Sequence, residues 1–254
     1  MELVYRPVLV TADAAFRALD LRFIMTGTER IPRVGGAVLA SNHVSYLDFI
    51  FAGLAAKDSK RFVRFMAKEA VFTNKLSGPL MRGMRHIPVD RDAGMAGFRA
   101  ALQALKDGEV IGVFPEATIS RSYTVKEIKS GAIRLAQATG TPLIPVAVWG
   151  GQRFFTKGNP RSIVLHRPIS ISVGEPIHPT RGDDAAALTE ELHTRMQDLL
   201  ERVQRVHPDQ PRPGEDAPWH PAHLGGTAPT LERAAELDEA ERRARLEKRR
   251  ARAT

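Results

Sequence analysis

The sequence predicts an α/β domain, because short apolar runs alternate with longer segments of helical periodicity along most of its 254 residues. Hydrophobic residues make up 43% of the chain, which is enough to build a substantial buried core. The chain has no cysteine, so disulfides, thiolate metal sites and thiol nucleophiles are excluded and a reducing compartment is expected. Any catalysis must therefore use other side chains.

The first predicted element is an amphipathic helix within residues 1–24, because Val8, Ala12, Phe16, Leu19 and Phe23 recur at helical spacing. Its apolar face would either pack against the core or lie in the headgroup layer of a membrane. Further helices are predicted at residues 47–56, 69–81, 95–106, 131–139 and 185–206. Strands are predicted at residues 37–41, 63–67, 86–89, 110–114, 143–148, 163–165 and 169–173.

The composition changes after residue 206, and we place a domain boundary there. Residues 207–230 are rich in Pro, Gly and His, cannot continue a helix, and predict an extended linker or arm. Residues 231–254 hold eight basic and six acidic side chains and predict a solvated helix or a disordered tail. The alternative for this tail is electrostatic docking of its basic half on anionic lipid.

Lys and Arg outnumber Asp and Glu by 37 to 29, and the net charge of +8 would suit an anionic partner such as nucleic acid, a membrane surface or a phosphorylated substrate. Residues 57–91 carry nine basic and three acidic side chains, which form either an ordinary solvated surface or a focused field for anions. Nucleic acid is disfavoured, because aromatic residues are only 6% of the chain and no zinc-ligand spacing occurs. No segment approaches the roughly 20 apolar residues that span a bilayer. The amino-terminal residues do not form a signal-peptide pattern, so a cytoplasmic location is expected.

His43 follows the apolar run GAVLAS and precedes a helical stretch, so it is expected at a junction between a strand and a helix. Asp48 comes five residues later. A neutral imidazole takes a proton from a hydroxyl, and a carboxylate on its other nitrogen sets the tautomer and stabilises the imidazolium. The alternative is a structural His near a helix whose first turn carries Asp.

Three further segments decide between these interpretations: GMRHIPVDR at residues 83–91, VFPEATIS at 113–120 and LIPVAV at 143–148. Together with NHVSYLD at residues 42–48, they closely resemble the glycerophospholipid acyltransferase family, whose members acylate glycerol 3-phosphate or lysophosphatidic acid. The resemblance spans about residues 35–148. It implies an acyltransferase domain built on a mixed central sheet flanked by helices, which the change of composition after residue 206 places over residues 1–206. It also implies an acyl-CoA or acyl carrier protein donor, no cofactor and no metal.

By this resemblance, His43 is the general base that activates the acceptor hydroxyl, and Asp48 orients it. The hydroxyl would attack the thioester directly, which agrees with the absence of cysteine and of a G-x-S-x-G nucleophile elbow. Arg91 matches the phosphate-binding arginine of the second motif, and a guanidinium suits bidentate phosphate geometry. The other expected substrate-binding residues are Asn42 as an oxyanion donor, Lys68 and Arg85 as added charge, Glu116 and Thr118 in the acceptor site, and Pro145 at the acyl pocket.

The third motif departs from the family, which commonly reads FPEGTRS. Here Ala117 replaces the glycine and Ile119 replaces the arginine, so a cation for the acceptor phosphate is lost; Arg121 is a candidate replacement. The acceptor is therefore either lysophosphatidic acid or a lysophospholipid with another headgroup. A noncatalytic lipid-binding relative is the further alternative. The lipid substrates predict peripheral association with the inner face of the cell membrane.

Overall fold

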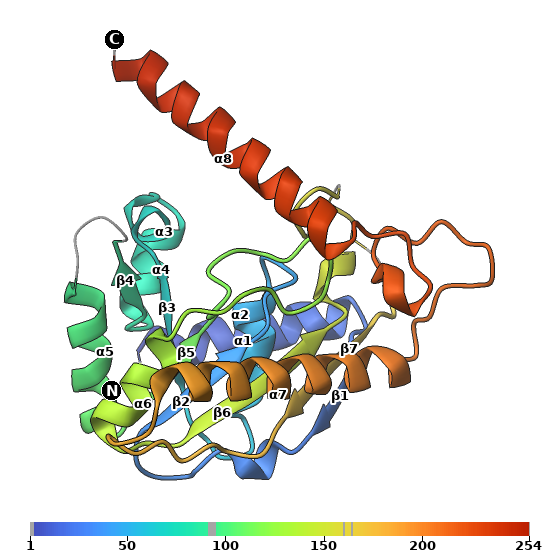
Figure 1. Ribbon diagram of the computed structural model, residues 1–254. Coiled ribbons are helices and arrows are strands. Elements are labelled where there is room, and N and C mark those ends of the chain that lie inside the picture. The colour runs from blue at the N-terminus through green and yellow to red at the C-terminus, as the bar shows by residue number, and fades with distance from the viewer. Residues whose placement is uncertain (1–2, 91–94, 160, 164, 254) are drawn as a thin grey trace.

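The computed structural model describes residues 3–90, 95–159, 161–163 and 165–253 of the chain. Its centre is a seven-stranded sheet with the strand order β1-β7-β6-β2-β5-β3-β4 (Figure 1). Strands β6 and β7 pair antiparallel, and every other neighbouring pair is parallel. The predicted α/β domain with a mixed central sheet is confirmed. The strands are β1 (Arg22–Thr26), β2 (Ala37–Ser41), β3 (Val63–Lys68), β4 (Ile87–Val89), β5 (Val110–Val113), β6 (Leu143–Trp149) and β7 (Pro168–Val173).

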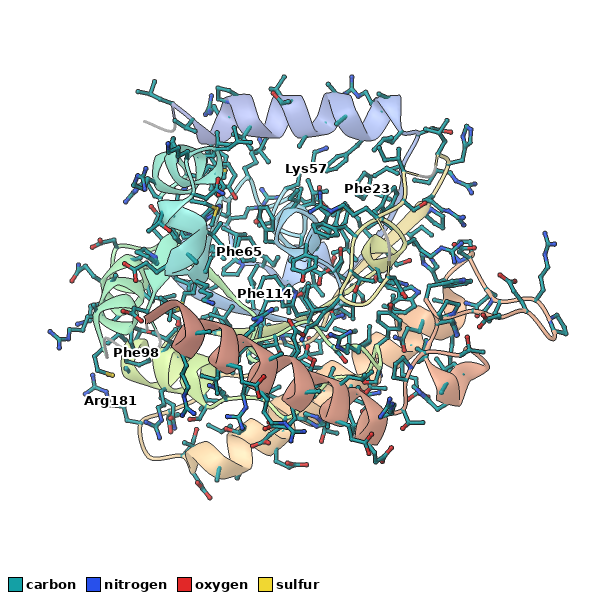
Figure 2. The ribbon with its side chains drawn as sticks, turned by 90° about the horizontal axis from the view of Figure 1, so that it is seen from above. Phe23, Lys57, Phe65, Phe98, Phe114 and Arg181 are labelled. Carbon is teal, nitrogen blue, oxygen red and sulfur yellow. The ribbon has the colours of Figure 1, made fainter. Side chains whose placement is uncertain are left out.

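Helices cover both faces of the sheet, so the molecule has three layers; α1 lies on one side in Figure 2 and α7 on the other. One face packs against α5, α6 and α7, and the opposite face packs against α1 and α2. Every residue of β2, β5 and β6 is buried, which explains why these strands are unbroken apolar runs in the sequence. The α-helices are α1 (Tyr5–Ala18), α2 (Asp48–Leu54), α3 (Glu69–Thr73), α4 (Ser77–Gly83), α5 (Ala96–Lys106), α6 (Gly131–Thr139), α7 (Ala185–Val206) and α8 (Leu231–Ala253), and the 3-10 helices are η1 (Thr28–Arg30), η2 (Gly151–Arg153) and η3 (Ala222–Leu224).

The helices α6 and α7 begin and end where the sequence predicts. Gly140 ends α6 with φ of +66°, a left-handed conformation that glycine adopts without a Cβ clash. The side chain of Asp184 caps α7 by accepting a hydrogen bond from the backbone N–H of Ala186 at 2.8 Å. Local end signals therefore determine both helices.

The prediction that the first helix runs to residue 24 is wrong. The helix α1 ends at Ala18, and the chain turns at Asp20, whose φ is +48°, before it enters β1. Phe23 lies in β1, opposite Ile169 of β7, and its ring packs 5.1 Å from that of Phe16. A helix and the strand after it thus contribute to one apolar cluster, which produces a spacing that looks helical throughout.

Two other predicted elements differ from the structure. The helix predicted at residues 69–81 is divided into α3 and α4 by Asn74, whose side-chain oxygen accepts hydrogen bonds from the backbone N–H groups of Leu76 and Ser77. The strand predicted at residues 163–165 is not formed. Ile163 and Leu165 are both exposed, and residue 164 lies outside the described part of the chain.

The carboxy-terminal residues return to the body of the domain. Within residues 207–230, Trp219 and His220 are buried, and the guanidinium of Arg153 lies 3.8 Å from the centre of the Trp219 ring. The tail is helical as α8, which crosses above the sheet and extends away from it at its carboxyl end (Figure 1). The domain boundary at residue 206 remains a prediction.

None of the helices in the described residues combines the length and the apolar character that a membrane span requires.

Candidate active site

The candidate site lies where two neighbouring parallel strands, β2 and β5, end at the same edge of the sheet. His43 follows the last residue of β2 by two positions, and Glu116 follows the last residue of β5 by three. In open α/β sheets, the carboxyl ends of parallel strands are the usual place for ligand sites. The topology therefore brings the first and third sequence motifs together.

His43 and Asp48 form a hydrogen-bonded pair at this edge. The Nδ1 atom of His43 lies 3.0 Å from Oδ2 of Asp48. The same oxygen accepts hydrogen bonds from the backbone N–H groups of Val44, at 2.6 Å, and Ser45, at 2.7 Å. Asp48 is the first residue of α2 and is completely buried, whereas the His43 side chain is 20% exposed. The turn thus holds one edge of the imidazole against the carboxylate and leaves the ring accessible to a ligand.

This pairing sets the chemistry of the imidazole. With a proton on Nδ1 directed at the carboxylate, Nε2 is the nitrogen that accepts a proton. Burial raises the pKa of Asp48 above its usual range, against the opposing effect of His43 and the two backbone donors. The ring of His43 stacks on that of Phe114, with 4.3 Å between the ring centroids. The ring of Phe65 also stacks on that of Phe114, with 5.7 Å between the centroids. These contacts restrict rotation of the imidazole.

Glu116 joins the loop after β5 to the turn that carries His43. Its Oε1 accepts the backbone N–H of His43 at 2.8 Å, and its Oε2 accepts that of Lys126 at 3.0 Å. A second bond between the same loops runs from the backbone N–H of Ser120 to the carbonyl of His43 at 2.7 Å. Glu116 is buried, and burial raises its pKa to about 8. Glu116 thus holds the backbone of His43, and its role in organising the acceptor site remains a prediction.

The raised pKa of Glu116 predicts a pH dependence of stability. The folded protein keeps a proton on this carboxyl between the ordinary pKa of 4.5 and about 8, whereas the unfolded chain releases it. The contribution of Glu116 to the free energy of unfolding therefore falls as pH rises through this window. Because Glu116→Gln does not titrate, the Tm of the wild type minus that of the variant is expected to be larger at about pH 5 than at about pH 8.

Differential scanning calorimetry at both pH values measures this difference. Glu127→Gln is the matched control, because Glu127 is an exposed carboxylate on the same loop. A difference between wild type and Glu116→Gln that stays constant across the window would contradict the prediction.

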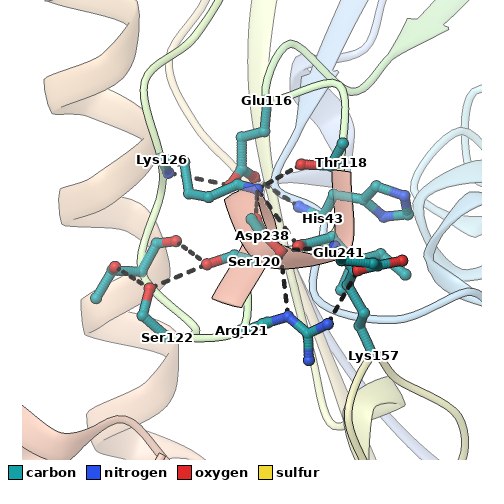
Figure 3. Close-up of polar contacts among 12 residues, drawn as sticks. His43, Glu116, Thr118, Ser120, Arg121, Ser122, Lys126, Lys157, Asp238 and Glu241 are labelled. Atoms are coloured by element: carbon teal, nitrogen blue, oxygen red, sulfur yellow. Dashed lines mark hydrogen bonds and ion pairs between the residues drawn. The ribbon is translucent and has the colours of Figure 1, made fainter. Parts of the chain in front are cut away.

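The two departures in the third motif have clear structural settings. Ala117 has a φ of +61°, which explains why related sequences use glycine at this position. Ile119 is apolar and buried, so this position supplies no cation in place of the arginine of the family pattern. Thr118 accepts a hydrogen bond from Nζ of Lys126 and lies close to Glu116 (Figure 3).

Ala117→Gly is expected to stabilise the fold by about 0.5–1 kcal/mol, because a left-handed backbone strains alanine by more than the extra flexibility of glycine costs. Thermal unfolding monitored by circular dichroism checks this. Ala138→Gly in the regular helix α6 is the matched control and is expected to destabilise by roughly 1 kcal/mol. If both variants lost stability equally, the strain assigned to Ala117 would be wrong.

Asn42, the residue directly after β2, and Pro145 of β6 are both buried. The Asn42 amide pairs with both backbone groups of Val148: its Nδ2 donates to the carbonyl at 3.0 Å, and its Oδ1 accepts the N–H at 2.7 Å. This contact ties the residue after β2 to β6 and engages one of the two N–H groups of the amide predicted as an oxyanion donor. Pro145 of β6 lies opposite Ala40 of β2, and its carbonyl accepts a hydrogen bond from the backbone N–H of Gly174 at 2.8 Å.

Of the basic residues predicted for phosphate, Lys68 and Arg85 lie within the described part of the chain. Lys68 is exposed at the carboxyl end of β3, at the same edge of the sheet as His43. Arg85 forms an ion pair with Glu109 at 3.0 Å, which directs it to a different partner. Arg91 lies outside the described residues.

A set of cations that no motif identifies lies next to the candidate site. Arg121, Lys126 and Lys157, which we call the basic cluster, all contact the carboxylate of Asp238 from α8, and Arg121 and Lys157 also contact that of Glu241 (Figure 3). The sequence offers Arg121 as a replacement for the lost arginine. It carries no signal for Lys126 or Lys157, since neither belongs to a motif and both reach the site only through the folded chain.

The comparison with known families agrees with this geometry. A family model described as Acyltransferase matches residues 22–149, which is about half of the chain and includes His43, Asp48 and Glu116. The chain belongs to the acyltransferase family. The resemblance drawn from the four sequence motifs is therefore confirmed.

Similar proteins are consistent with this membership. The acyltransferase is 30% identical to the 1-acyl-sn-glycerol-3-phosphate acyltransferase of Bacillus subtilis over 70% of this chain and 88% of that protein. It is 28% identical to the protein of that name from Borreliella burgdorferi, over 63% of this chain and 61% of that protein. Its fold matches the crystal structure of PlsC, the 1-acyl-sn-glycerophosphate acyltransferase of Thermotoga maritima, with a TM-score of 0.63, 22% identity and 78% coverage of both chains.

Proposed function

We propose that this acyltransferase moves a fatty acyl group from a thioester donor to the free hydroxyl of 1-acyl-sn-glycerol 3-phosphate, giving phosphatidic acid. The observation that carries the proposal is the contact between Nδ1 of His43 and the buried carboxylate of Asp48, which leaves Nε2 for the acceptor hydroxyl. The names of the relatives from Bacillus subtilis and Borreliella burgdorferi support the choice of acceptor.

In the proposed reaction, Nε2 of His43 removes the hydroxyl proton as the oxygen attacks the thioester carbonyl. The carboxylate of Asp48 stabilises the imidazolium that forms. Collapse of the tetrahedral intermediate breaks the carbon–sulfur bond, and the imidazolium returns its proton to the departing thiolate. The acyl group thus moves directly from the thioester to the acceptor oxygen without an acyl-enzyme intermediate, which agrees with a chain that has no cysteine. Acyl-CoA and acyl-loaded acyl carrier protein are both thioesters, so either can donate the acyl group in this reaction.

The direct test is transfer of labelled acyl groups by the purified full chain to a panel of lysophospholipids with different headgroups. Lysophosphatidic acid is expected to be the preferred acceptor. Preference for another headgroup would retain the mechanism but change the acceptor. Other headgroups are included because the buried Ile119 stands where the family pattern has an arginine. Absence of product with both acyl-CoA and acyl carrier protein would favour a noncatalytic lipid-binding protein.

We also propose that the protein binds the membrane surface through α3, α4 and the turn between them. Val71, Leu76 and Leu80 are exposed there; Lys68 precedes them in the sequence, and Lys75 lies between Val71 and Leu76. Apolar side chains that insert at the headgroup boundary, beside lysines that face anionic lipid, are the usual elements of an interfacial membrane site. This face lies at the end of β3, beside the catalytic edge, where a lipid acceptor would enter.

Leu76→Glu is expected to lower the fraction of protein that sediments with anionic vesicles by at least about threefold, because a charge would have to enter the apolar boundary. The matched control is Ile163→Glu, since Ile163 is exposed to a similar extent, 84% against 82% for Leu76, on a different loop. Equal sedimentation of the two variants would exclude α3 and α4 as the membrane contact.

A further inference from the structure

The basic cluster is a compact arrangement of cations directed at one point. Lys157 Nζ lies 2.6 Å and Arg121 Nε 3.1 Å from Oδ1 of Asp238, and Lys126 Nζ lies 3.1 Å from Oδ2 (Figure 3). Glu241 accepts from the same arginine at 3.0 Å and from Lys157 at 2.7 Å. The three cationic side chains are only 13–17% exposed. Several converging donors of this kind form a site for an anion with several oxygens.

Two members of the cluster, Arg121 and Lys126, lie on the loop after β5 that is bonded to the turn of His43. The backbone N–H of Lys126 binds Oε2 of Glu116, whose Oε1 binds the backbone N–H of His43. The Nζ of Lys126 also donates to the carbonyl of Ile119 at 3.4 Å. The ammonium of Lys126 therefore lies beside the residue that replaces the arginine of the family pattern, on a loop that is hydrogen-bonded to the backbone of His43.

The hold of α8 on the cluster is mainly ionic. Among its described side chains only Ala234 is buried, and those from Arg242 to Glu247 are exposed. Burial raises the pKa of Asp238, but hydrogen bonds from Lys157 and Lys126 outweigh it and keep that pKa below its usual range. The carboxylate is thus bound as an anion, by contacts that salt screens and that another anion can replace.

A phosphate monoester fits the cluster better than two carboxylates do. It carries a charge of about −1.5 to −2 at pH 7 and presents three acceptor oxygens on one centre, which matches three converging cations. The carboxylates of Asp238 and Glu241 must instead be brought there by a helix that has little other contact with the domain.

We propose that Arg121, Lys126 and Lys157 form the site for the phosphate monoester of the acceptor, and that Asp238 and Glu241 of α8 occupy it as an internal competitor until the acceptor binds. This inference rests on the proposed function for the identity of the acceptor. The anion site itself is testable without catalysis.

The experiment titrates the full chain with glycerol 3-phosphate, inorganic phosphate and coenzyme A by isothermal titration calorimetry at low ionic strength. Asp238→Asn/Glu241→Gln removes the competitor. The matched control is Glu236→Gln/Glu239→Gln, which changes the charge of α8 equally but affects carboxylates paired with Arg233 and Arg242 of the same helix. Lys157→Gln is tested in the background without the competitor, so that neither Asp238 nor Glu241 is left as a carboxylate without its lysine partner.

Removal of the competitor is expected to tighten the binding of glycerol 3-phosphate about tenfold, which corresponds to α8 occupying the cluster in roughly nine of ten molecules. The control variant should bind within about twofold of wild type, and Lys157→Gln should weaken binding at least about tenfold. Equal glycerol 3-phosphate affinity in all variants would overturn the proposal. Inorganic phosphate binding as tightly as glycerol 3-phosphate, or tightening limited to coenzyme A, would overturn the assignment to the acceptor.

Acyl transfer to lysophosphatidic acid is measured separately on the same proteins. If the wild type forms product but the binding of glycerol 3-phosphate does not depend on the basic cluster, the proposed function is left intact and the anion site is refuted. Binding of glycerol 3-phosphate that depends on the cluster, without product, would support the anion site and refute the proposed function.

Discussion

His43→Gln is expected to lower kcat for acyl transfer by about 10³-fold, since a positioned general base typically contributes between about 10² and 10⁴. Glutamine fills a similar volume and keeps a polar end, but it does not take a proton from the acceptor hydroxyl. The side chain is 20% exposed and makes its main contacts with Asp48 and Phe114, so the variant should fold. Steady-state transfer of labelled acyl groups measures kcat, and far-ultraviolet circular dichroism confirms the fold.

The chain contains a second His–Asp pair that serves as a matched control. Nδ1 of His166 lies 2.6 Å from Oδ2 of Asp20, and both side chains are well exposed, at 70% and 64%. His166→Gln should leave kcat within about twofold of wild type, because surface substitutions of this kind change little. Activity retained by His43→Gln would exclude His43 as the base.

Asp48→Asn is expected to lower kcat by about 10²–10³-fold, because the neutral amide does not stabilise the imidazolium that forms in the reaction. Its cost to stability should also be clear. Oδ2 of Asp48 binds three donors, and the buried Oδ1 has no hydrogen-bond partner among the described residues. Either orientation of the asparagine amide therefore leaves a buried donor without an acceptor or places two donors face to face.

Kinetics and thermal unfolding of Asp48→Asn are measured together, with Asp20→Asn from the exposed pair as the control. A large drop in kcat at 25 °C, well below the Tm of the variant, separates the loss of charge from the loss of fold. Wild-type kcat in a folded Asp48→Asn protein would contradict the proposed role of the carboxylate.

The central elements of the fold were predictable because their signals are local. β2, α6 and α7 have the predicted ends, since buried parallel strands are continuous apolar runs and the helices carry their own caps. The prediction failed at the first helix, where Phe16 and Phe23 are spaced as on one helix but meet by packing a helix on a strand. Periodicity reports that residues share an apolar cluster and does not distinguish these two ways of forming it.

The pairing of His43 with Asp48 was predictable for the same reason, because the two residues lie five residues apart and a single turn joins them. The role of Glu116 required the fold, since only the pairing of β2 with β5 brings its carboxylate to the backbone of His43. The basic cluster depended on it entirely: Asp238 lies 117 residues from Arg121 and 112 from Lys126 along the chain. Charges leave no periodic or spacing signal of their distant partners, because an ion pair depends on where the folded backbone places each side chain.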